Sequence, residues 1–396
     1  MSSKQFWNYW RSQLSAICLR SYADDPEGGI GLPIRRSTTY RFTEESLSKY
    51  SSGHGRDIWL YSRYGNPTVR AVERKLAALE QTEDAVVTAS GMAAVSAVLF
   101  ACAQPGERWF VSSELYGVTY ALLEQDLRKI GVSIEYLTPH NPLEWQLAAE
   151  SGKRPTLFYF ETLSNPLARP AAVPELIEIA KSVEAVTVID NTFATPYHCI
   201  PSSLGADFVI ESGSKYLNGH SDVIAGVVAG TTEKITPVWK QMTRLGGCLD
   251  PNSAYLWDRG LQSFPLRIAA ATANAEILSK QFLEHPEVET ISYPGIQDTV
   301  PEWLAGGSGV FSLRLLGGDE RAMRFLFRLK TIVAATSLGG TETLASMPSN
   351  TSHAALTETQ RTAIGILPGT VRIACGTEDY QVLVHDIEQA IIESKE

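Results

Sequence analysis

Three residues with reactive or strongly polar side chains lie at the ends of predicted buried strands. Asn165 follows TLFYFET, Asp190 ends VTVID, and Lys215 follows DFVIES. Each has an ordinary explanation when taken alone, because Asn165 precedes a proline, Asp190 can begin a turn, and a loop lysine is normally solvated. The carboxyl ends of parallel strands, however, meet at one edge of a sheet, where ligands bind. We therefore expect the three side chains to converge on one site.

Lys215 has small neighbours, Ser212, Gly213 and Ser214, within the stretch ESGSKYLNGHSD. Such neighbours let a flat ring approach the lysine amine. A lysine amine forms a Schiff base with an aldehyde, and an acid keeps a pyridinium ring protonated so that the ring withdraws electrons. The pattern therefore favours an aldehyde cofactor that carries a ring nitrogen.

A phosphate seat is predicted at SGM, residues 90–92, which follows a strand and opens a helix. Backbone N–H groups at a helix start bind phosphate, and a glycine allows the phosphate to come close. A plain serine N-cap is the alternative explanation. A cofactor that needs a lysine, a carboxylate and a phosphate seat is pyridoxal 5'-phosphate (PLP), and we predict it here.

The middle of the chain alternates between helix and strand patterns, so residues 66–255 form the predicted large domain. Continuous apolar strands that alternate with helices indicate a mostly parallel sheet covered on both faces, and hence an α/β fold. The strands are expected at 85–89, 108–113, 156–162, 186–190 and 207–212, and the helices at 66–80, 90–103, 122–131 and 174–182.

The two flanks differ from this pattern. Residues 1–65 are rich in Gly, Ser and Arg with weak periodicity, which predicts an arm outside the core. Residues 256–396 predict a smaller C-terminal α+β domain. Its expected elements are a helix at 265–285, a half-exposed strand at 308–316, a strand at 370–376 and a helix at 378–394.

Composition excludes several classes of protein. The 34 basic and 44 acidic residues give a net charge of −10, and no basic cluster appears, so we expect no nucleic-acid surface. The five cysteines lack CxxC or metal-ligand spacing, which argues against a disulfide framework and a metal site and fits a reducing cytoplasm. No signal-peptide core and no long apolar run is present, so no membrane segment is expected.

The sequence resembles the Cys/Met-metabolism family of PLP-dependent enzymes, the group of cystathionine γ-synthase, cystathionine γ-lyase and methionine γ-lyase. The resemblance implies the aspartate aminotransferase-like PLP-dependent transferase fold, fold type I. The matching stretches, in family order, are YSRYGNPT, ASGMAA, LYGVTY, ETLSNP, VIDNTFATP, ESGSKYLNGHSDVIAG, LDPNSAYLWDRGLQSFPLR, SLGGTETLASMPSNTSH and VRIACGTED.

The resemblance implies a role for each residue that matches the family's cofactor site. Lys215 forms the Schiff base and moves protons, and Asp190 pairs with the pyridinium nitrogen. The other implied roles are Asn165 at the ring hydroxyl, backbone N–H groups of Gly91 and Met92 and hydroxyls of Ser212 and Ser214 at the phosphate, Tyr116 stacked on the ring as a catalytic base, and Tyr61 and Arg63 reaching the phosphate of a neighbouring subunit.

The resemblance also implies how the substrate is held. Arg372 would grip the α-carboxylate of an amino acid with its planar fork, which a lysine cannot copy. Ser337, Leu338 and Tyr116 would line the same pocket. Because the N-terminal arm contributes to a neighbouring site, a dimer is the implied minimal active unit, doubled to a homotetramer.

The implied reaction is PLP-dependent γ-elimination or γ-replacement on an L-amino acid, through a vinylglycine-type intermediate. Thr336 lies where enzymes that handle cystathionine resemble one another in having glutamate, and Val118 lies where methionine γ-lyases carry cysteine. These differences leave the substrate and leaving group open. The alternatives are β-elimination from cystathionine or cysteine, transamination, and a relative without catalytic activity.

Overall fold

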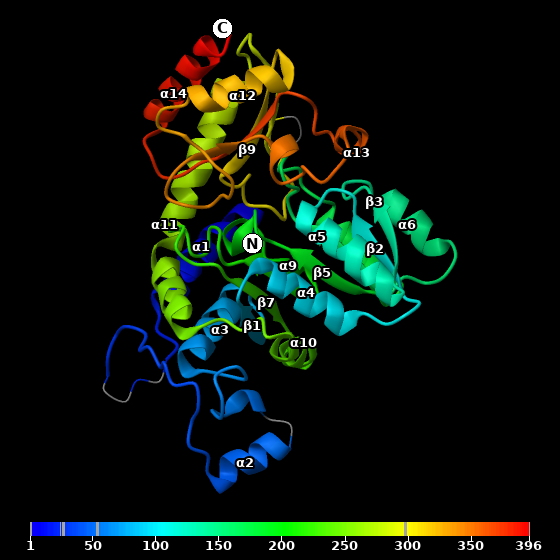
Figure 1. Ribbon diagram of the computed structural model, residues 1–396, viewed down its shortest axis with the longest axis vertical. Helices are drawn as coiled ribbons and strands as arrows, with labels where there is room; N and C mark the ends of the chain where they lie inside the picture. Colours follow the sequence, from blue (N-terminus) through cyan, green and yellow to red (C-terminus); the bar gives the residue numbers. More distant parts are fainter. Residues whose placement is uncertain (1, 24, 26–27, 53–54, 297–298, 396) are drawn as a thin grey trace.

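The structure, a computed structural model, describes residues 2–23, 25, 28–52, 55–296 and 299–395. A seven-stranded sheet occupies the middle of the molecule and a five-stranded sheet lies above it (Figure 1). The order of the larger sheet is β1-β7-β6-β5-β4-β2-β3. Its strands are β1 (Asp84–Thr88), β2 (Arg108–Ser112), β3 (Ser133–Leu137), β4 (Leu157–Glu161), β5 (Val186–Asp190), β6 (Phe208–Ser212) and β7 (Gly226–Gly230).

The larger sheet is mostly parallel, as predicted, and only β7 runs antiparallel to its neighbours β1 and β6. Strands β3 and β7 were not expected from the sequence. GVVAG in β7 is short and begins and ends with glycine, which weakens the strand pattern. Gly226 is needed there, because a Cβ at this position would lie 2.4 Å from the carbonyl oxygen of Ser90.

Helices surround the larger sheet, and α4 (Gly91–Cys102) begins at the predicted phosphate seat. The Ser90 hydroxyl accepts the N–H of Ala93 at 3.0 Å, so the serine N-cap is present.

The helix predicted at 122–131 is irregular. It consists of a π turn, Leu123–Leu127, and a 3-10 turn, Arg128–Ile130. The helices are α3 (Pro67–Leu79), α4 (Gly91–Cys102), α5 (Gly117–Leu122), α6 (Pro142–Glu150), α7 (Val173–Ser182), α8 (Thr195–His198), α9 (Pro201–Leu204) and α10 (Thr232–Leu245).

The smaller sheet has the order β10-β11-β12-β9-β8 and is mainly antiparallel. The prediction that 308–316 is half exposed is wrong for β9, because one face packs on the helices and Ser312 on the other face donates to the Pro166 carbonyl at 2.8 Å. The elements are β8 (Val288–Ser292), β9 (Val310–Leu315), α12 (Gly318–Arg328), β10 (Val333–Ala334), β11 (Leu344–Ser346), α13 (Glu358–Ala363), β12 (Thr370–Ala374) and α14 (Tyr380–Glu393).

The first helix, α1 (Ser3–Leu19), corrects the prediction that all of residues 1–65 lie outside the core. Its buried face carries Trp7, Trp10, Leu14 and Cys18, which join the largest apolar cluster. Trp10 also donates its indole N–H to the Pro196 carbonyl at 2.6 Å. This buried face was not predicted, because four buried side chains among 17 residues give only a weak apolar periodicity.

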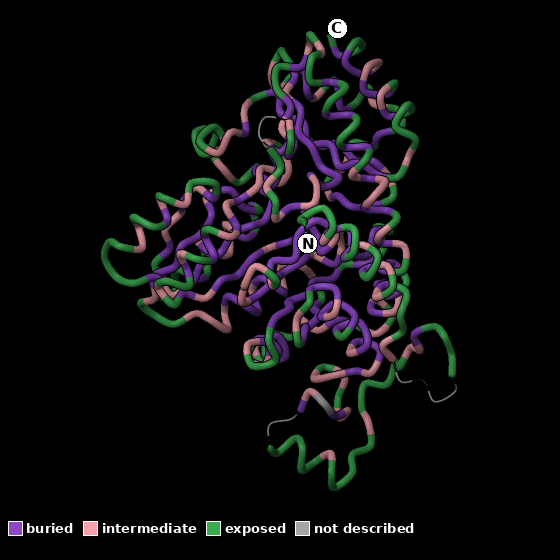
Figure 2. Tube along the Cα trace, turned by 180° about the vertical axis from the view of Figure 1, so that it is seen from behind, coloured by how far each residue is buried: buried purple, intermediate pink, exposed green. Residues whose placement is uncertain are grey.

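Most of the remaining N-terminal segment is exposed, although Leu32 joins the largest apolar cluster and Ile58 is buried. The segment carries the exposed helix α2 (Glu44–Ser51) and the short turn η1 (Gly55–Asp57). Figure 2 shows this exposed segment extending below the buried interior of the two sheets.

Helix α11 (Pro251–Gln281) links the two sheets and is longer than the predicted helix 265–285. It starts at Asp250, whose carboxylate accepts the N–H groups of Asn252 and Ser253. Pro265 lies inside the helix without ending it, and the predicted domain boundary at 255/256 falls within its first turns. Within the described residues, no helix is both long and apolar enough to cross a membrane.

Candidate active site

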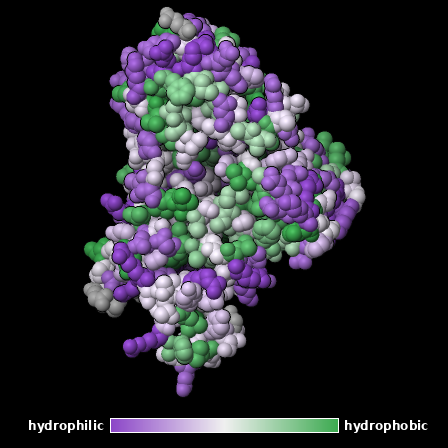
Figure 3. Space-filling view, viewed as in Figure 1, coloured by the Kyte–Doolittle hydropathy of each residue, from purple (hydrophilic) through white to green (hydrophobic). Residues whose placement is uncertain are grey.

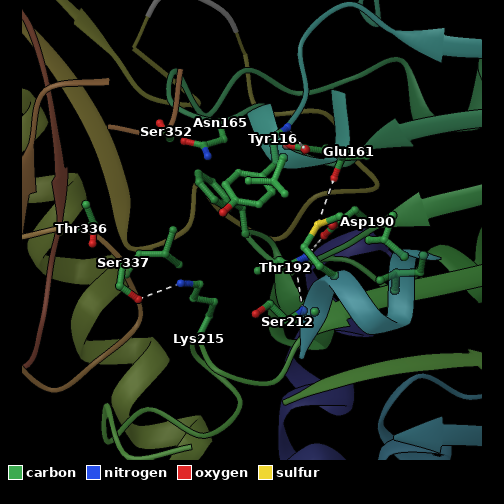
Figure 4. Close-up of a pocket in the computed structure, with 18 of the residues that line it drawn as sticks. Tyr116, Glu161, Asn165, Asp190, Thr192, Ser212, Lys215, Thr336, Ser337 and Ser352 are labelled. Atoms are coloured by element: carbon green, nitrogen blue, oxygen red, sulfur yellow. Dashed lines mark hydrogen bonds between the residues drawn. The ribbon is translucent and has the colours of Figure 1, made fainter. Parts of the chain in front are cut away.

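A cavity of about 580 Å³ opens between the carboxyl ends of β4, β5 and β6 and the loops of the smaller sheet. The surface is hollowed between these two parts of the molecule (Figure 3), and the lining side chains converge from both (Figure 4). The lining residues are Ser90, Gly91, Met92, Val95, Tyr116, Val118, Thr119, Glu161, Leu163, Asn165, Asp190, Thr192, Phe193, Ile210, Ser212, Lys215, Thr336, Ser337, Leu338, Asn350, Thr351, Ser352 and Arg372.

The structure brings together most of the residues predicted from the sequence. Asn165, Asp190 and Lys215 line one cavity because their parallel strands end at one edge of the sheet. Arg372, Ser337 and Leu338, which are distant in the sequence, reach the same cavity from the smaller sheet and its loops. The expected convergence of a lysine, a carboxylate and an arginine is therefore present.

The start of α4 forms one wall of the cavity. Gly91 lies so close to β6 that a Cβ there would be 3.0 Å from the Cβ of Ser212. The Ser212 N–H donates to the Thr192 hydroxyl at 2.9 Å, which holds the end of β6 against the turn after β5. This wall offers helix-start N–H groups and a serine hydroxyl, the donors that a phosphate binds.

Ser214 is the one predicted phosphate donor of this wall that does not line the cavity. Its hydroxyl accepts the N–H of Ala225 at 2.9 Å and also lies 3.3 Å from the Ala225 carbonyl. In this structure the hydroxyl therefore holds the loop before β7.

Asp190 supplies a carboxylate at the base of the cavity. It accepts the backbone N–H of Thr192 at 2.9 Å. Burial raises the pKa of this carboxyl, and the hydrogen bonds from Thr192 oppose the rise. A bound cation, such as a protonated ring nitrogen, would favour its ionised form.

Lys215 lies across the cavity from Asp190 (Figure 4). Its Nζ donates to the hydroxyl of Ser337 at 2.8 Å. Burial, followed by the charge of Arg372, lowers the pKa of this amine to about 8. A neutral amine is the nucleophile that attacks an aldehyde, so this environment activates the lysine near neutral pH.

Arg372 lies on β12 with only 5% of its surface exposed. Its two terminal nitrogens donate to the Asn165 side-chain oxygen at 3.1 Å and to the Ser337 carbonyl at 2.7 Å. Burial lowers the pKa of this guanidinium to about 10, which leaves it charged at neutral pH. The group is a fixed cation at the cavity wall, suited to a carboxylate.

Tyr116 and Glu161 lie close together, in the upper part of the view in Figure 4. Glu161 ends β4, and its carboxyl accepts the N–H of Tyr116 at 2.6 Å. Sequence reasoning missed Glu161 and Thr192. The register of β4 and β5, in which Glu161 pairs with Asp190, is the signal that would have identified Glu161, and this register is not evident from the sequence.

Tyr61 and Arg63 lie outside the cavity. Tyr61 is 44% exposed, and Arg63 donates to the Thr243 carbonyl at 3.0 Å. Both belong to the segment between α2 and α3. In the part of the chain that the structure describes, Tyr61 and Arg63 therefore do not line the same cavity as the other predicted cofactor residues.

The mouth of the cavity is lined by neutral side chains. Val118 lies in the first turn of α5, Thr336 follows β10, and Ser352 lies in the loop before α13. Asn350 and Thr351 line the cavity beside Ser352. Among the described residues that line the cavity, the Asp, Glu, Lys, Arg and His side chains are those of Glu161, Asp190, Lys215 and Arg372. Three of them are bonded to the cavity wall, Lys215 and Arg372 to Ser337 and Glu161 to the N–H of Tyr116.

The residues present fit PLP. The close approach of Gly91 to Ser212 leaves a backbone-lined wall for a phosphate, and Asp190 and Lys215 offer an acid and an activated amine in the same cavity. When bound there, PLP would supply an electron sink for reactions at the α-carbon of an amino acid.

Comparisons with known proteins show what the whole chain is similar to. A relative named L-methionine gamma-lyase, from Fusobacterium nucleatum subsp. polymorphum, is 33% identical over 374 residues, which cover 92% of this chain and 94% of the relative. An O-succinylhomoserine sulfhydrylase from Pseudomonas aeruginosa is 33% identical over 373 residues, which cover 92% of each chain.

A solved structure of cystathionine gamma synthase from Xanthomonas oryzae pv. oryzae, in complex with aminoacrylate and cysteine, has the same fold with a TM-score of 0.89. It is 31% identical, and the match covers 96% of this chain and 98% of that one. The predicted fold, that of the type I PLP-dependent transferases, is confirmed.

Residues 15–392 match the family described as Cys/Met metabolism PLP-dependent enzyme. The match includes every residue of the cavity and both sheets. The chain belongs to the Cys/Met metabolism family of PLP-dependent enzymes.

Proposed function

We propose that this enzyme, which eliminates or replaces the γ-substituent of an L-amino acid, acts on substrates whose γ-substituent is uncharged. The observation that carries the proposal is the neutral mouth of the cavity. Transfer of a charged group from water into a protein site without a partner costs roughly several kcal/mol of free energy, even after the protein relaxes. Val118, Thr336 and Ser352 provide no such partner for a distal amine or carboxylate.

The cofactor is held, in this proposal, by the residues at the base. Asp190 holds the proton of the ring nitrogen, Asn165 contacts the ring hydroxyl, and Tyr116 covers one face of the ring. The phosphate contacts come from Gly91, Met92, Ser212 and Ser214, with Tyr61 and Arg63 of a neighbouring subunit. The support for these roles is that the residues of this chain other than Ser214 line the cavity, and that Tyr61 is exposed. The Ser214 hydroxyl would have to leave Ala225 to reach a phosphate.

Arg372 orients the substrate. Its terminal nitrogens point to the side where Asn165 and Ser337 lie, so a carboxylate bound there would be fixed next to Lys215. Ser337 and Leu338 complete this part of the wall. The α-carbon of such a substrate is then close to the amine that has to remove its proton.

Lys215 is proposed to move the protons of the reaction. In its neutral form the amine accepts the α-proton, and it then delivers a proton to another carbon of the substrate. A pKa near 8 makes both transfers feasible near neutral pH. Tyr116, which is 38% exposed at the cavity edge, would take the proton of the incoming substrate amine.

The arrangement of chains is proposed from the same features. Residues 1–65 form an arm for a neighbouring subunit, 66–255 the PLP-binding domain and 256–396 the C-terminal domain, within a homotetramer in the cytoplasm. The extended segment that carries Tyr61 supports the arm, except that α1 packs on its own chain. Sedimentation and cross-linking of the purified protein would test the assembly.

The test of the proposed function is a product analysis with the holoenzyme. Methionine and O-acetylhomoserine are compared with O-succinylhomoserine, cystathionine and cysteine, with and without an added thiol, and the products are identified by mass. We expect 2-oxobutyrate, or a γ-substituted product, from the uncharged substrates. Pyruvate from cysteine or cystathionine alone would replace this proposal with β-elimination.

A further inference from the structure

A second carboxyl group, Glu161, lies beside Asp190 at the base of the cavity. Glu161 and Asp190 end the neighbouring parallel strands β4 and β5 and are paired in register. Registered residues on parallel strands point to the same face of a sheet, and both side chains line the cavity. The residue is 7% exposed, so its carboxyl is largely shielded from water.

The Glu161 carboxyl connects two loops that face the cavity. It accepts the backbone N–H of Tyr116 at 2.6 Å, and the backbone N–H of Asn165 makes a further favourable contact with it. Helix α5, which begins after Tyr116, has no side-chain cap of its own. The position of Tyr116 therefore depends on a residue that is distant in the sequence.

The surroundings of Glu161 disfavour a second negative charge. The titratable groups that act on it are Asp190 and Glu114, and the Tyr159 phenol lies near both Glu161 and Asp190. Glu114 is itself paired with Arg169 at 2.7 Å, and no base acts on the Glu161 carboxyl among its described neighbours. Burial, and then the charge of Asp190, raises the pKa of Glu161 well above its usual range.

Two buried carboxyl groups at one site share the available charge, because both cannot ionise without a nearby cation. A protonated carboxyl still accepts N–H groups through its carbonyl oxygen. Glu161 can therefore keep its bonds to the two loops after it has taken up a proton.

We infer that Glu161 is a positioning residue that works in its protonated form, holding the Tyr116 and Asn165 loops in place while Asp190 carries the negative charge of the pair. This inference rests on the proposed role of Asp190 as partner of the PLP ring nitrogen. It adds a requirement to that role: Glu161 has to be neutral, so that the negative charge of the pair lies on Asp190, next to the ring nitrogen.

The test compares Glu161→Gln with Glu161→Ala. Glutamine keeps an acceptor oxygen in the place of the neutral acid, whereas alanine removes it. Apo-protein is titrated with pyridoxal phosphate, and the dissociation constant is measured by absorbance over a range of pH. We expect Glu161→Ala to bind roughly tenfold more weakly, a difference of about 1.4 kcal/mol, because two backbone N–H groups lose their buried acceptor. Glu161→Gln should restore most of this loss.

A second readout separates positioning from a general loss of structure. The pH at which the visible absorbance of the bound cofactor changes should be similar in wild type and Glu161→Gln and shifted in Glu161→Ala. Thermal unfolding of the apo-proteins reports whether each variant folds. Equal weakening by glutamine and alanine would show that an ionised carboxylate is needed, and wild-type binding by alanine would show no positioning role; either result overturns the inference.

Asp190→Asn distinguishes failure of the inference from failure of the proposed function. If Asp190 pairs with the ring nitrogen, this variant binds pyridoxal phosphate much more weakly than wild type, whatever Glu161 does. If Asp190→Asn binds like wild type, the proposed role of Asp190 is wrong. If it binds weakly while the two Glu161 variants behave alike, only the inference about Glu161 is wrong.

Discussion

The Nζ of Lys215 donates to the Ser337 hydroxyl at 2.8 Å, and the same serine's carbonyl accepts Arg372 at 2.7 Å. Lys215 follows β6 of the larger sheet, whereas Ser337 and Arg372 belong to the part of the chain that forms the smaller sheet. Ser337 has a positive φ of 86°, an uncommon conformation for a residue with a side chain. One serine thus sets the positions of both bases of the site.

The low pKa of Lys215 predicts how cofactor association depends on pH. Only the neutral amine attacks the aldehyde, so the rate at which apo-protein binds pyridoxal phosphate should rise with pH and level off above about 8. Because the charge of Arg372 contributes to the lowering, Arg372→Gln should raise the pKa and move the profile to higher pH. Stopped-flow absorbance measures both profiles, and a rate independent of pH would contradict the expectation.

Arg372→Lys should lower kcat/KM for an amino acid substrate by roughly a hundredfold, since loss of a buried charge pair costs about 2–5 kcal/mol. The lysine keeps a charge but cannot bind Asn165, Ser337 and a carboxylate in one plane. Arg244→Lys is the matched control, because Arg244 is exposed at the end of α10 and bonds to Gln241. A loss of the same size in the control would point to an unspecific effect.

Thr336→Glu should change the preference for distal charge. A carboxylate at the mouth would attract a distal amine, so kcat/KM for cystathionine relative to methionine should rise by about tenfold, the effect of roughly 1.4 kcal/mol. Thr336→Gln, of the same size but neutral, is the control. If the two variants show the same substrate ratio, charge at this position does not determine specificity.

A second pair of buried acids, Glu80 and Glu211, predicts how stability depends on pH. Their carboxyls lie against each other in the core, close to Asn191 and the Cys199 thiol. The charge of Asp190 also acts on Glu211. Burial raises the pKa of Glu80 to about 7 and that of Glu211 well above its usual range. Raised carboxyl pKa values stabilise the fold at low pH, and this stabilisation is lost as pH rises through the folded-state values.

Glu211→Gln should therefore raise the unfolding temperature relative to wild type, and more so in alkaline than in mildly acidic buffer. Each pKa unit of the shift corresponds to about 1.4 kcal/mol. Glu287→Gln is the contrasting variant, because ion pairs with Lys395 and Arg321 lower the pKa of that half-buried acid to about 2. Calorimetry at several pH values checks the prediction, and equal effects of Glu211→Gln at all pH values would contradict it.

Gly213→Ala should destabilise the protein by about 1–3 kcal/mol through overpacking. A Cβ at Gly213 would lie 2.4 Å from the ring of Trp257, which is completely buried. Gly31→Ala is the matched control, because nothing lies within 4 Å of its added Cβ. Denaturant unfolding of both variants gives the difference, and equal stability would show that Trp257 can move aside.

Local patterns predicted the parts of the fold that depend on neighbours in the chain. Apolar runs of five to seven residues placed β4, β5 and β6 to within two residues at each end, and the helix predicted at 90–103 is α4 to within one residue at each end. The glycine-bounded strand β7 and the single buried face of α1 were not predicted, because packing against distant residues outweighs a weak local preference there.

By itself, the sequence determined which chemical groups end each strand, and therefore that Asn165, Asp190 and Lys215 share one sheet edge. Only the tertiary structure decided that Ser337 bonds Lys215, and that Glu161 lies beside Asp190. The physical reason is that side-chain periodicity reports burial within an element. The register of strands and the meeting of loops 122 residues apart depend on how whole elements pack.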